Sequence, residues 1–349
     1  MTNRVMRRRM GLDIKPVKPQ RMIKVYNRMP CPQFHGIWCL PSEEWAEVPE
    51  DLAIRLVNDP NYEISDPILN PKSNRKRPSL VQGKSVDIII PVHNQLKFLK
   101  QCILSVKQNT SDYRLIIVDD GSDKEVADWI DEQGFDEVIR NKKPQGFGKS
   151  CNAGILKSTA PWICVLNSDT IVTPFWMAIM QSVASMGFGI VGPTTSHSSG
   201  LQCDHRISVK RHQMYSADIV KVADEKLRKN GTKFTECDVF GFCMIFNQAV
   251  VKMVGGFDHA RYLEGYYEDW DFVWRAQMMG FRSAWAEGAY VHHYGGTSFF
   301  DKIGMDKVHA LSDRNCRIFE ARKASGDELY FEMRVRKANN GKGTISQSA

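Results

Sequence analysis

Several common patterns are missing from this chain of 349 residues. No stretch approaches the roughly 18 consecutive apolar residues that a membrane-spanning helix needs. The nine cysteines are odd in number and form no Cys-x-x-Cys pair, which argues against a zinc site and a disulfide framework. The Arg-rich start, Met1–Met10, is followed by no apolar core and so differs from a secretory signal. These absences predict a cytoplasmic protein, or one of the host cytoplasm if it is viral.

The net charge of +7 is distributed unevenly along the chain. Residues 1–30 carry +8, the segment 72–77 carries +4 and the segment 334–342 carries +4. Since these flanks total +16, the rest of the chain carries −9. Basic flanks on an acidic body fit a polyanionic partner, either nucleic acid or an anionic membrane surface. They fit solvated, partly disordered ends equally well.

Composition along the chain predicts five segments. We expect a basic disordered arm at 1–20, a small α+β module with a basic linker at 21–80, a main domain at 81–300, a helical extension at 301–335 and a disordered basic tail at 336–349. Within the module, strands are predicted at 22–26 and 37–40 and a short helix at 49–56, and the extension should hold a helix at 305–324.

From Val86 onward, apolar strands alternate with segments of helical periodicity. Strands are predicted at 86–91, 115–118, 137–140 and 162–166, with helices between them. This order predicts right-handed βαβ units, and therefore an α/β fold with a mostly parallel, Rossmann-like sheet. Later in the chain we expect a strand at 237–246, helices at 248–254 and 270–279, and short strands at 284–286 and 290–292. Polar residues that end parallel strands place the chemistry at one edge of the sheet.

Two acidic motifs are the strongest indications of chemistry. Asp169, in Leu166-Asn167-Ser168-Asp169-Thr170, follows a strand and is a candidate ligand for a cation that holds a diphosphate. Asp269, in Glu268-Asp269-Trp270-Asp271, is a candidate general base whose acidic neighbours would raise its pKa. A helix N-terminus decorated with acids explains Glu268 and Asp269 equally well.

Other polar residues are weaker candidates. Asp119 and Asp120 follow a strand and could contact a uracil or a ribose, although an acidic cap on the next helix is the alternative. The glycine-rich segment 146–154 matches neither a phosphate loop nor a dinucleotide fingerprint, but its Lys149 or Asn152 could touch phosphate or sugar. The pair His292-His293 could complete a metal site or be structural.

The motifs occur in a characteristic order: Ile89-Ile90-Pro91-Val92-His93-Asn94, Val118-Asp119-Asp120-Gly121-Ser122, Gly146-Phe147 with Asn152-Ala153-Gly154, Leu166-Asn167-Ser168-Asp169-Thr170, Gly255-Gly256-Phe257-Asp258, Tyr267-Glu268-Asp269-Trp270-Asp271-Phe272 with Arg275, and His292-His293-Tyr294-Gly295-Gly296-Thr297-Ser298. Over residues 86–298 the chain closely resembles the family-2-type glycosyltransferases of GT-A fold, rhamnosyltransferase-like members included. The resemblance implies transfer of a sugar with inversion at the anomeric carbon. It also implies a divalent cation, Mn²⁺ or Mg²⁺, and a nucleotide-sugar donor, for which a UDP-sugar is expected.

The resemblance assigns roles to individual residues. Pro91, His93 and Asn94 would border the nucleoside, and Asp120, together with Asp119, would bind base and ribose. In the donor-binding motif, Asp169 matches the last acid of the family's Asp-x-Asp, and Ser168 matches its middle residue. Asn167 stands in place of the first acid, and this change removes one negative charge from the site. Asp269 matches the catalytic base, and Glu268 would lie beside it near the acceptor. His293 matches the metal-binding histidine of the family, with His292 as the alternative.

The acceptor is left open by the sequence. A glycan or a lipid-linked saccharide is the first expectation for an enzyme of this resemblance. The basic flanks, and a similarity of the N-terminal module to small accessory modules of bacteriophage proteins, favour DNA with a hydroxymethylated pyrimidine as the alternative. A non-catalytic binding protein would require a damaged site, which only Asn167 suggests. A nucleotidyltransferase would require a Gly-rich basic loop after Ile90, which this chain lacks.

Overall fold

The computed structural model describes residues 86–325, apart from 199, 208, 210–214, 263–264 and 296–304, and before residue 86 it describes only the backbone of five strands. The chain divides into two compact units, residues 1–76 and 77–349. The predicted basic arm, linker and tail lie outside the described residues, as does all but the first residue of the helix expected at 49–56.

In the N-terminal unit the described elements are strands. A three-stranded antiparallel sheet has the order β4 (Trp45–Pro49), β1 (Met22–Asn27) and β5 (Tyr62–Ile64). Strands β2 (Gln33–His35) and β3 (Trp38–Leu40) form a separate antiparallel pair. The strands expected at 22–26 and 37–40 therefore exist, each with a boundary shifted by one residue.

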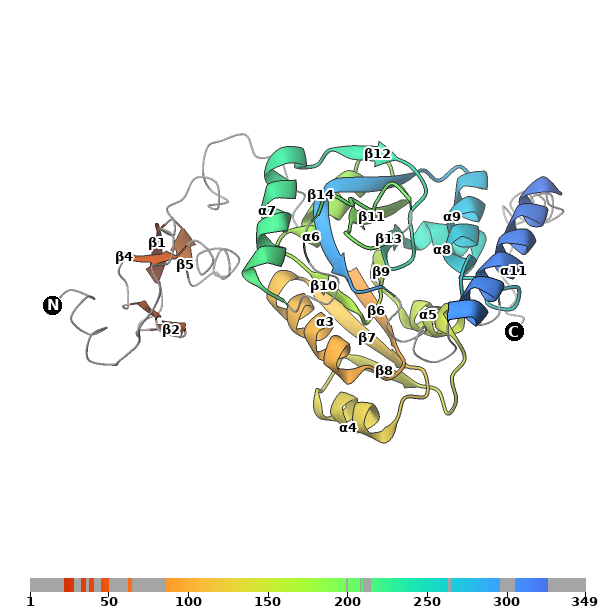
Figure 1. Ribbon diagram of the computed structural model, residues 1–349, viewed down its shortest axis with the longest axis horizontal. Helices are drawn as coiled ribbons and strands as arrows, with labels where there is room; N and C mark the ends of the chain where they lie inside the picture. The colour runs from red at the N-terminus through yellow and green to blue at the C-terminus, as the bar shows by residue number, and fades with distance from the viewer. Residues whose placement is uncertain are drawn as a thin grey trace. The chain divides into compact units, whose positions relative to one another are not determined.

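The larger unit is built on one sheet of nine strands among the described residues, shown in Figure 1. Its order is β10 (Thr170–Val172), β14 (Ser283–His293), β11 (Ile190–Thr194), β13 (Cys243–Asn247), β9 (Trp162–Leu166), β6 (Val86–Val92), β7 (Tyr113–Asp119) and β8 (Glu137–Arg140), with β12 (Phe234–Glu236) paired to β14. The helices are α3 (Leu96–Asn109), α4 (Lys124–Glu132), α5 (Phe147–Lys157), α6 (Trp176–Ala184), α7 (Ala217–Asn230), α8 (Gln248–Val254), α9 (Glu268–Met278) and α11 (Met305–Ala324).

The strand directions confirm the predicted α/β fold with a mostly parallel sheet. Strands β6, β7, β8, β9, β11 and β14 run in one direction, whereas β10, β12 and β13 run in the other. After β6 the chain adds β7 and β8 on one side and then returns to place β9 on the other side. This reversal occurs beside the carboxyl end of β6, which is where open α/β sheets bind ligands.

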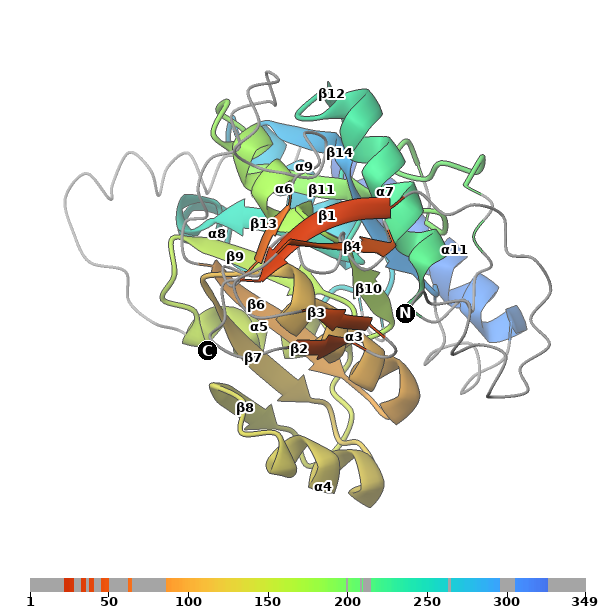
Figure 2. The same ribbon diagram turned by 90° about the vertical axis from the view of Figure 1, so that its left-hand side faces the viewer.

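Helices cover both faces of the sheet, as Figures 1 and 2 show. Alternate residues of β6 point to opposite faces, so Ile88 and Ile90 join the core under α3, α4 and α6, and Ile89 joins the core under α5, α8 and α9. Gly154 allows α5 to approach closely, because a Cβ there would collide with the Ile89 side chain. The sheet is thus buried on both faces, which explains its continuous apolar strands.

The second half of the unit differs from the sequence predictions in two places. The strand expected at 237–246 is wrong at its start, because 237–242 lies outside any strand and only Cys243–Asn247 forms β13. The two short strands expected at 284–286 and 290–292 are one strand, β14. Gly288 lies within β14, where only glycine fits, because a Cβ there would collide with the carbonyl of Gly231.

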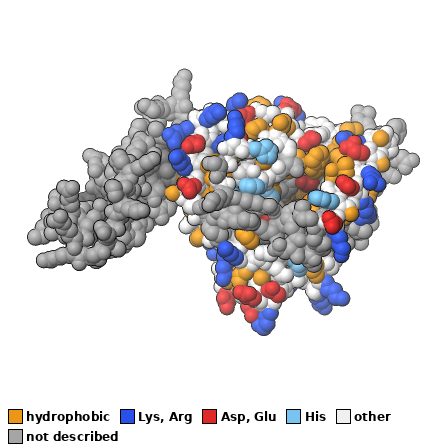
Figure 3. Space-filling view, in the orientation of Figure 1, with side chains coloured by type: hydrophobic (Ala, Val, Ile, Leu, Met, Phe, Trp, Pro, Cys, Tyr) orange, Lys and Arg blue, Asp and Glu red, His pale blue; other side chains and the backbone are white. Residues whose placement is uncertain are grey.

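The surface of α4 is acidic. Its exposed carboxylates, which gather at the lower end of the molecule in Figure 3, are Glu125, Asp128, Asp131 and Glu132. Of the helices that the structure describes, none combines the length and the apolar character that crossing a bilayer would require.

Candidate active site

The register of the sheet brings together Asp169 and His293, although they are far apart in the sequence. Strand β10 follows Asp169 and pairs with β14 so that Thr170 lies opposite His293. The backbone N–H of Tyr294 donates to the Asp169 carbonyl at 3.0 Å. The two side chains then face each other, with His293 Nε2 3.4 Å from Asp169 Oδ1.

A backbone carbonyl fixes the tautomer of His293. Its Nδ1 lies 2.8 Å from the carbonyl of His197, so the proton of a neutral ring resides on Nδ1 and Nε2 presents a lone pair. The ring also stacks on Phe242, with the centroids 5.0 Å apart. A histidine held through Nδ1 by a carbonyl is the usual arrangement of a metal ligand.

Asn167 completes this group. Its side-chain nitrogen is 3.5 Å from His293 Nε2, and its buried Oδ1 has no hydrogen-bond partner among the described residues. No cluster of three or more His, Cys, Asp or Glu side chains suited to a metal occurs in the described part of the chain. Asp169 and His293 with the amide oxygen of Asn167 nevertheless fit a divalent cation that takes its other ligands from substrate phosphates.

His292 lies elsewhere. It follows Tyr290 by two residues in β14 and therefore shares its face of the strand, opposite to that of His293. It is fully buried, and its Nδ1 lies 3.2 Å from the Tyr290 hydroxyl and 3.4 Å from Ser196 Oγ. Of the two histidines, the structure thus brings only His293 to Asp169.

Asp120 holds a neighbouring loop. Its Oδ1 accepts hydrogen bonds from Asn141 Nδ2 and the backbone N–H of Gln145, both at 2.8 Å, and its Oδ2 accepts one from the N–H of Gly146 at 2.9 Å. A carboxylate has about four acceptor positions, so this side chain retains little capacity for a ligand. It fixes the loop that leads into α5.

Asp119 is also used internally. It is almost fully buried, and it accepts hydrogen bonds from the N–H of Ser122 and from Arg140 Nε, both at 2.9 Å. Asn94, with its left-handed backbone, bridges to the same turn, because its N–H donates to Ser122 Oγ and its Oδ1 accepts from the N–H of Asp123. His93 Nδ1 lies 3.0 Å from the carbonyl of Asp120.

The remaining donor-side candidates differ in exposure. Pro91 is buried within β6, and Ser168 is half-buried in the turn between β9 and β10. Lys149 is exposed and donates to Gln145 Oε1 at 2.8 Å. Asn152 is engaged on both sides by the backbone of Phe257, with its Oδ1 accepting from the N–H and its Nδ2 donating to the carbonyl, each at 2.8 Å. It therefore anchors the loop after α8.

Asp269 is held by two backbone groups. Its Oδ2 accepts from the N–H of Gly241 at 2.7 Å and its Oδ1 from the N–H of Trp270 at 2.9 Å. Burial raises the pKa of this half-buried carboxyl, although these hydrogen bonds oppose the shift. A Cβ at position 241 would lie 3.0 Å from Asp269 Oδ2, so glycine permits the contact.

Glu268 is the most unusual acid of the site. It is 4% exposed, and its Oε2 has no hydrogen-bond partner among the described residues. Burial, followed by repulsion from Asp269 and Asp271, raises its pKa to about 8. Near neutral pH this side chain is therefore mostly protonated in the native protein.

The separate candidates converge on one place. A Cβ at Gly148 in α5 would lie 3.5 Å from Glu268 Cγ, and the N–H of Gly146 just before this helix donates to Asp120, so both acids lie at the start of α5. The dipeptide Gly241-Phe242 links the base to the cation ligands, because Gly241 binds Asp269 while the Phe242 carbonyl accepts from the N–H of Asn167 at 2.9 Å. The arrangement can hold a diphosphate beside a proton acceptor.

Sequence reasoning missed three contributors to this site. Gly241 donates its backbone N–H to Asp269. Phe242 stacks its ring on His293 and accepts from Asn167 with its carbonyl. The carbonyl of His197 lies beside Nδ1 of His293. Backbone groups leave no side-chain signature, so these roles were not visible. The glycine between two phenylalanines was the one available signal, and it was absorbed into a predicted strand.

Comparison with known proteins agrees with this geometry. Residues 87–255 match the model of the family described as Glycosyl transferase family 2. This segment is therefore similar to the glycosyltransferase domains of that family. The match ends before Asp269 and His293, so their roles rest on the resemblance noted above and on the geometry. The family confirms the recognised resemblance, and with the sheet topology it supports the GT-A type of α/β fold.

Curated relatives of this family 2 domain are distant. An uncharacterized glycosyltransferase of Rickettsia bellii is 30% identical over 28% of the chain and 15% of its own length. A teichoic acid poly(glycerol phosphate) polymerase of Staphylococcus epidermidis is 25% identical over 53% of the chain and 25% of its own length. An undecaprenyl-phosphate 4-deoxy-4-formamido-L-arabinose transferase of Photorhabdus laumondii is 28% identical over 33% of the chain. The chain spans only 15% to 38% of the length of these relatives.

Two solved structures resemble the family 2 domain. GalNAc-T7, crystallised with UDP, GalNAc and Mn²⁺, has a TM-score of 0.47 and 16% identity over 60% of the chain and 44% of its own. S. aureus TarS has a TM-score of 0.43 and 14% identity over 62% of the chain and 62% of its own.

Proposed function

We propose that this chain is an inverting, metal-dependent glycosyltransferase that moves a sugar from a nucleotide-sugar donor to an acceptor hydroxyl. The observation that carries the proposal is the Gly241-Phe242 link. Gly241 binds Asp269, the residue that we propose as the base, while Phe242 contacts Asn167 and His293 of the proposed cation site. A transferase of this kind needs a general base and a cation site close to the same bound donor.

The cation would be held by Asp169 Oδ1 and His293 Nε2, with Asn167 Oδ1 available as a further oxygen ligand. When bound, a divalent cation neutralises the negative charge that develops on the departing nucleoside diphosphate. Replacing an acid by Asn167 removes one negative charge but also leaves an oxygen whose hydrogen bonding is unsatisfied. A cation would satisfy that oxygen, which is why these residues fit Mn²⁺ or Mg²⁺.

Asp269 acts as the general base in this proposal. It takes the proton of the acceptor hydroxyl while the oxygen attacks the anomeric carbon from the side opposite the leaving diphosphate. One direct displacement inverts the configuration, and no covalent intermediate on the protein is needed. The raised pKa of Asp269 makes it a stronger proton acceptor than an exposed aspartate.

The donor and acceptor are proposed at the level of chemical class. We expect a UDP-sugar as donor and a glycan or a lipid-linked saccharide as acceptor. The names of two relatives, which specify an undecaprenyl phosphate and a teichoic acid, support that acceptor class. DNA is the competing acceptor and is tested in the same experiment.

The test is nucleotide release from a panel of UDP-sugars with Mn²⁺, with lipid-linked saccharide, hydroxymethylated DNA or no acceptor added. Asp269→Asn should retain donor binding and lose release by about a hundredfold or more, because general-base catalysis contributes roughly 10²–10⁴-fold. Full activity in Asp269→Asn would refute the assignment of the base. Release stimulated only by hydroxymethylated DNA would instead identify the acceptor as DNA.

A further inference from the structure

The backbone directly before Glu268 adopts a rare conformation. Gly265, Tyr266 and Tyr267 have successive φ angles of 112°, 66° and 72°. A non-glycine residue in this region costs on the order of 1–3 kcal/mol and persists only where surrounding contacts enforce it. Because α9 begins at Glu268, this turn determines where Glu268 and Asp269 leave the backbone.

Helix α11 supplies contacts that enforce the turn. The side chain of Asn315 is fully buried, and its Nδ2 donates to the carbonyl of Gly265 at 2.7 Å and to that of Tyr266 at 3.1 Å. One turn further along α11, the ring of Phe319 packs on Tyr267, with the centroids 5.8 Å apart. A helix about 50 residues away in sequence therefore binds three consecutive residues of the strained turn.

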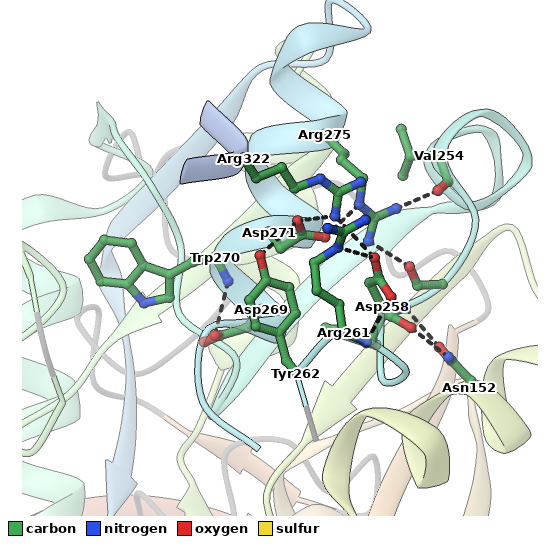
Figure 4. A network of polar contacts seen from close by, with 12 residues as sticks. Asn152, Val254, Asp258, Arg261, Tyr262, Asp269, Trp270, Asp271, Arg275 and Arg322 are labelled. Atoms are coloured by element: carbon green, nitrogen blue, oxygen red, sulfur yellow. Dashed lines mark hydrogen bonds and ion pairs between the residues drawn. The ribbon is translucent and has the colours of Figure 1, made fainter. Parts of the chain in front are cut away.

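Arg322 forms a second attachment, drawn in Figure 4. Its Nη1 lies 2.5 Å from Asp271 Oδ1 and 3.0 Å from Asp258 Oδ2. Asp271 is fully buried in α9 and also accepts from Arg275 Nε at 2.6 Å. Burial raises the pKa of Asp258, but Arg261 and Arg322 outweigh it and hold that pKa below its usual range. The attachment is thus an ionic network that joins α11 to Asp258 and to the helix that carries Asp269.

We infer that α11 is a positioning element of the active site, in which Asn315 and Arg322 fix the turn and helix that place Glu268 and Asp269. The inference rests on the proposed function, because it takes Asp269 as the base. It assigns a role to a segment that lies beyond the family match at 87–255. Neither residue touches substrate in this account, and both act through the backbone of 265–271.

The test compares variants of α11 by the rate of nucleotide release and by the donor KM. Asn315→Asp keeps the shape of the side chain but turns an oxygen towards two carbonyls, and Arg322→Met removes the charge. Both should lower kcat by about tenfold to a hundredfold, because a displacement near 1 Å can cost that much. The donor KM should stay within about twofold, since the cation ligands lie on other elements.

Two further variants separate positioning from general stability. Arg322 contacts both carboxylates through Nη1, and a lysine would keep the positive charge there, so Arg322→Lys should recover most of the kcat that Arg322→Met loses. Arg317→Met removes an exposed arginine from the same helix and should leave kcat unchanged. If Arg322→Met does not fold, Asn315→Asp and Arg322→Lys carry the comparison.

The outcomes distinguish this inference from the proposed function. Wild-type kcat in Asn315→Asp, alongside an inactive Asp269→Asn, would overturn the role of α11 and leave the base assignment intact. A fall in melting temperature with unchanged kcat in the folded variants would also overturn it. Activity in Asp269→Asn would instead show that the proposed function is wrong.

Discussion

The two sides of the candidate site differ in how far their buried polar groups are hydrogen-bonded. At the ends of β6 and β7, Asp119, Asp120 and Asn94 bond to neighbouring loops. At β9 and α9, by contrast, Asn167 Oδ1 and Glu268 Oε2 are buried without a hydrogen-bond partner among the described residues. One side is a completed internal network, and the other holds groups with unused capacity.

This difference separates residues that shape the site from residues that act on a ligand. Buried polar groups are nearly always satisfied, so the exceptions indicate where a ligand, water or ion completes the bonding. The satisfied network holds the loops at β6 and β7 in place, which would preorganise them for a nucleoside in the proposed function. The unsatisfied atoms lie beside the proposed cation and base. Substitutions on the first side should therefore change mainly stability, and substitutions on the second side mainly activity.

The largest expected effect on stability concerns the pH dependence caused by Glu268. The native protein holds this proton up to about pH 8, whereas an unfolded glutamate releases it near pH 4.3, about the ordinary value. Unfolding therefore releases a proton between these values, and stability falls as pH rises from about 4.5 to 8. We expect a loss on the order of a few kcal/mol in the absence of divalent cations.

Chemical denaturation of the wild type and of Glu268→Gln across this range measures the effect. The variant cannot ionise at this position, so its stability should depend less on pH. If the free energy of unfolding changed equally with pH in the two proteins, Glu268 would ionise normally. The site would then lack the unusual buried acid that distinguishes α9 from the ends of β6 and β7.

A smaller loss of stability is expected from Asp120→Ala. The substitution removes three hydrogen bonds that hold the loop before α5, so the free energy of unfolding should fall by about 1–3 kcal/mol. Asp169→Ala is the comparison variant and should weaken cation-dependent donor binding. An Asp120 variant that is fully stable but inactive would show that this carboxylate contacts the donor directly.

The sequence was sufficient for the first half of the fold, and it named most of the candidate site residues, whose roles remain predictions. Regular βαβ alternation predicted β6 to β9, because β6, β7 and β9 are apolar strands buried in the sheet and are followed by polar residues. The second half was harder, since Gly288 lies inside a strand and Gly241 lies outside one, and both are glycine because of a close neighbour that is distant in the sequence.

Motif order placed Asp169 and Asp269 in roles but could not distinguish a residue that binds a ligand from one that holds a loop. Asp120 and Asn152 fit a donor-binding motif as well as Asp169 does, and only their hydrogen-bond partners separate them. The choice between His292 and His293 depends on which face of β14 each occupies. That face follows from the register with β10, which local sequence does not encode.

The most direct test of the account is cation-dependent nucleotide binding by the two histidine variants. UDP is titrated calorimetrically into His293→Ala and into His292→Ala, with and without Mn²⁺. Circular dichroism checks that each variant is folded. The comparison shows which of the two histidines is needed for cation-dependent binding. The account predicts that His293→Ala loses the Mn²⁺-dependent part of UDP binding and that His292→Ala keeps it. Loss in His292→Ala alone, or wild-type binding in His293→Ala, would contradict a cation site at Asp169 and His293.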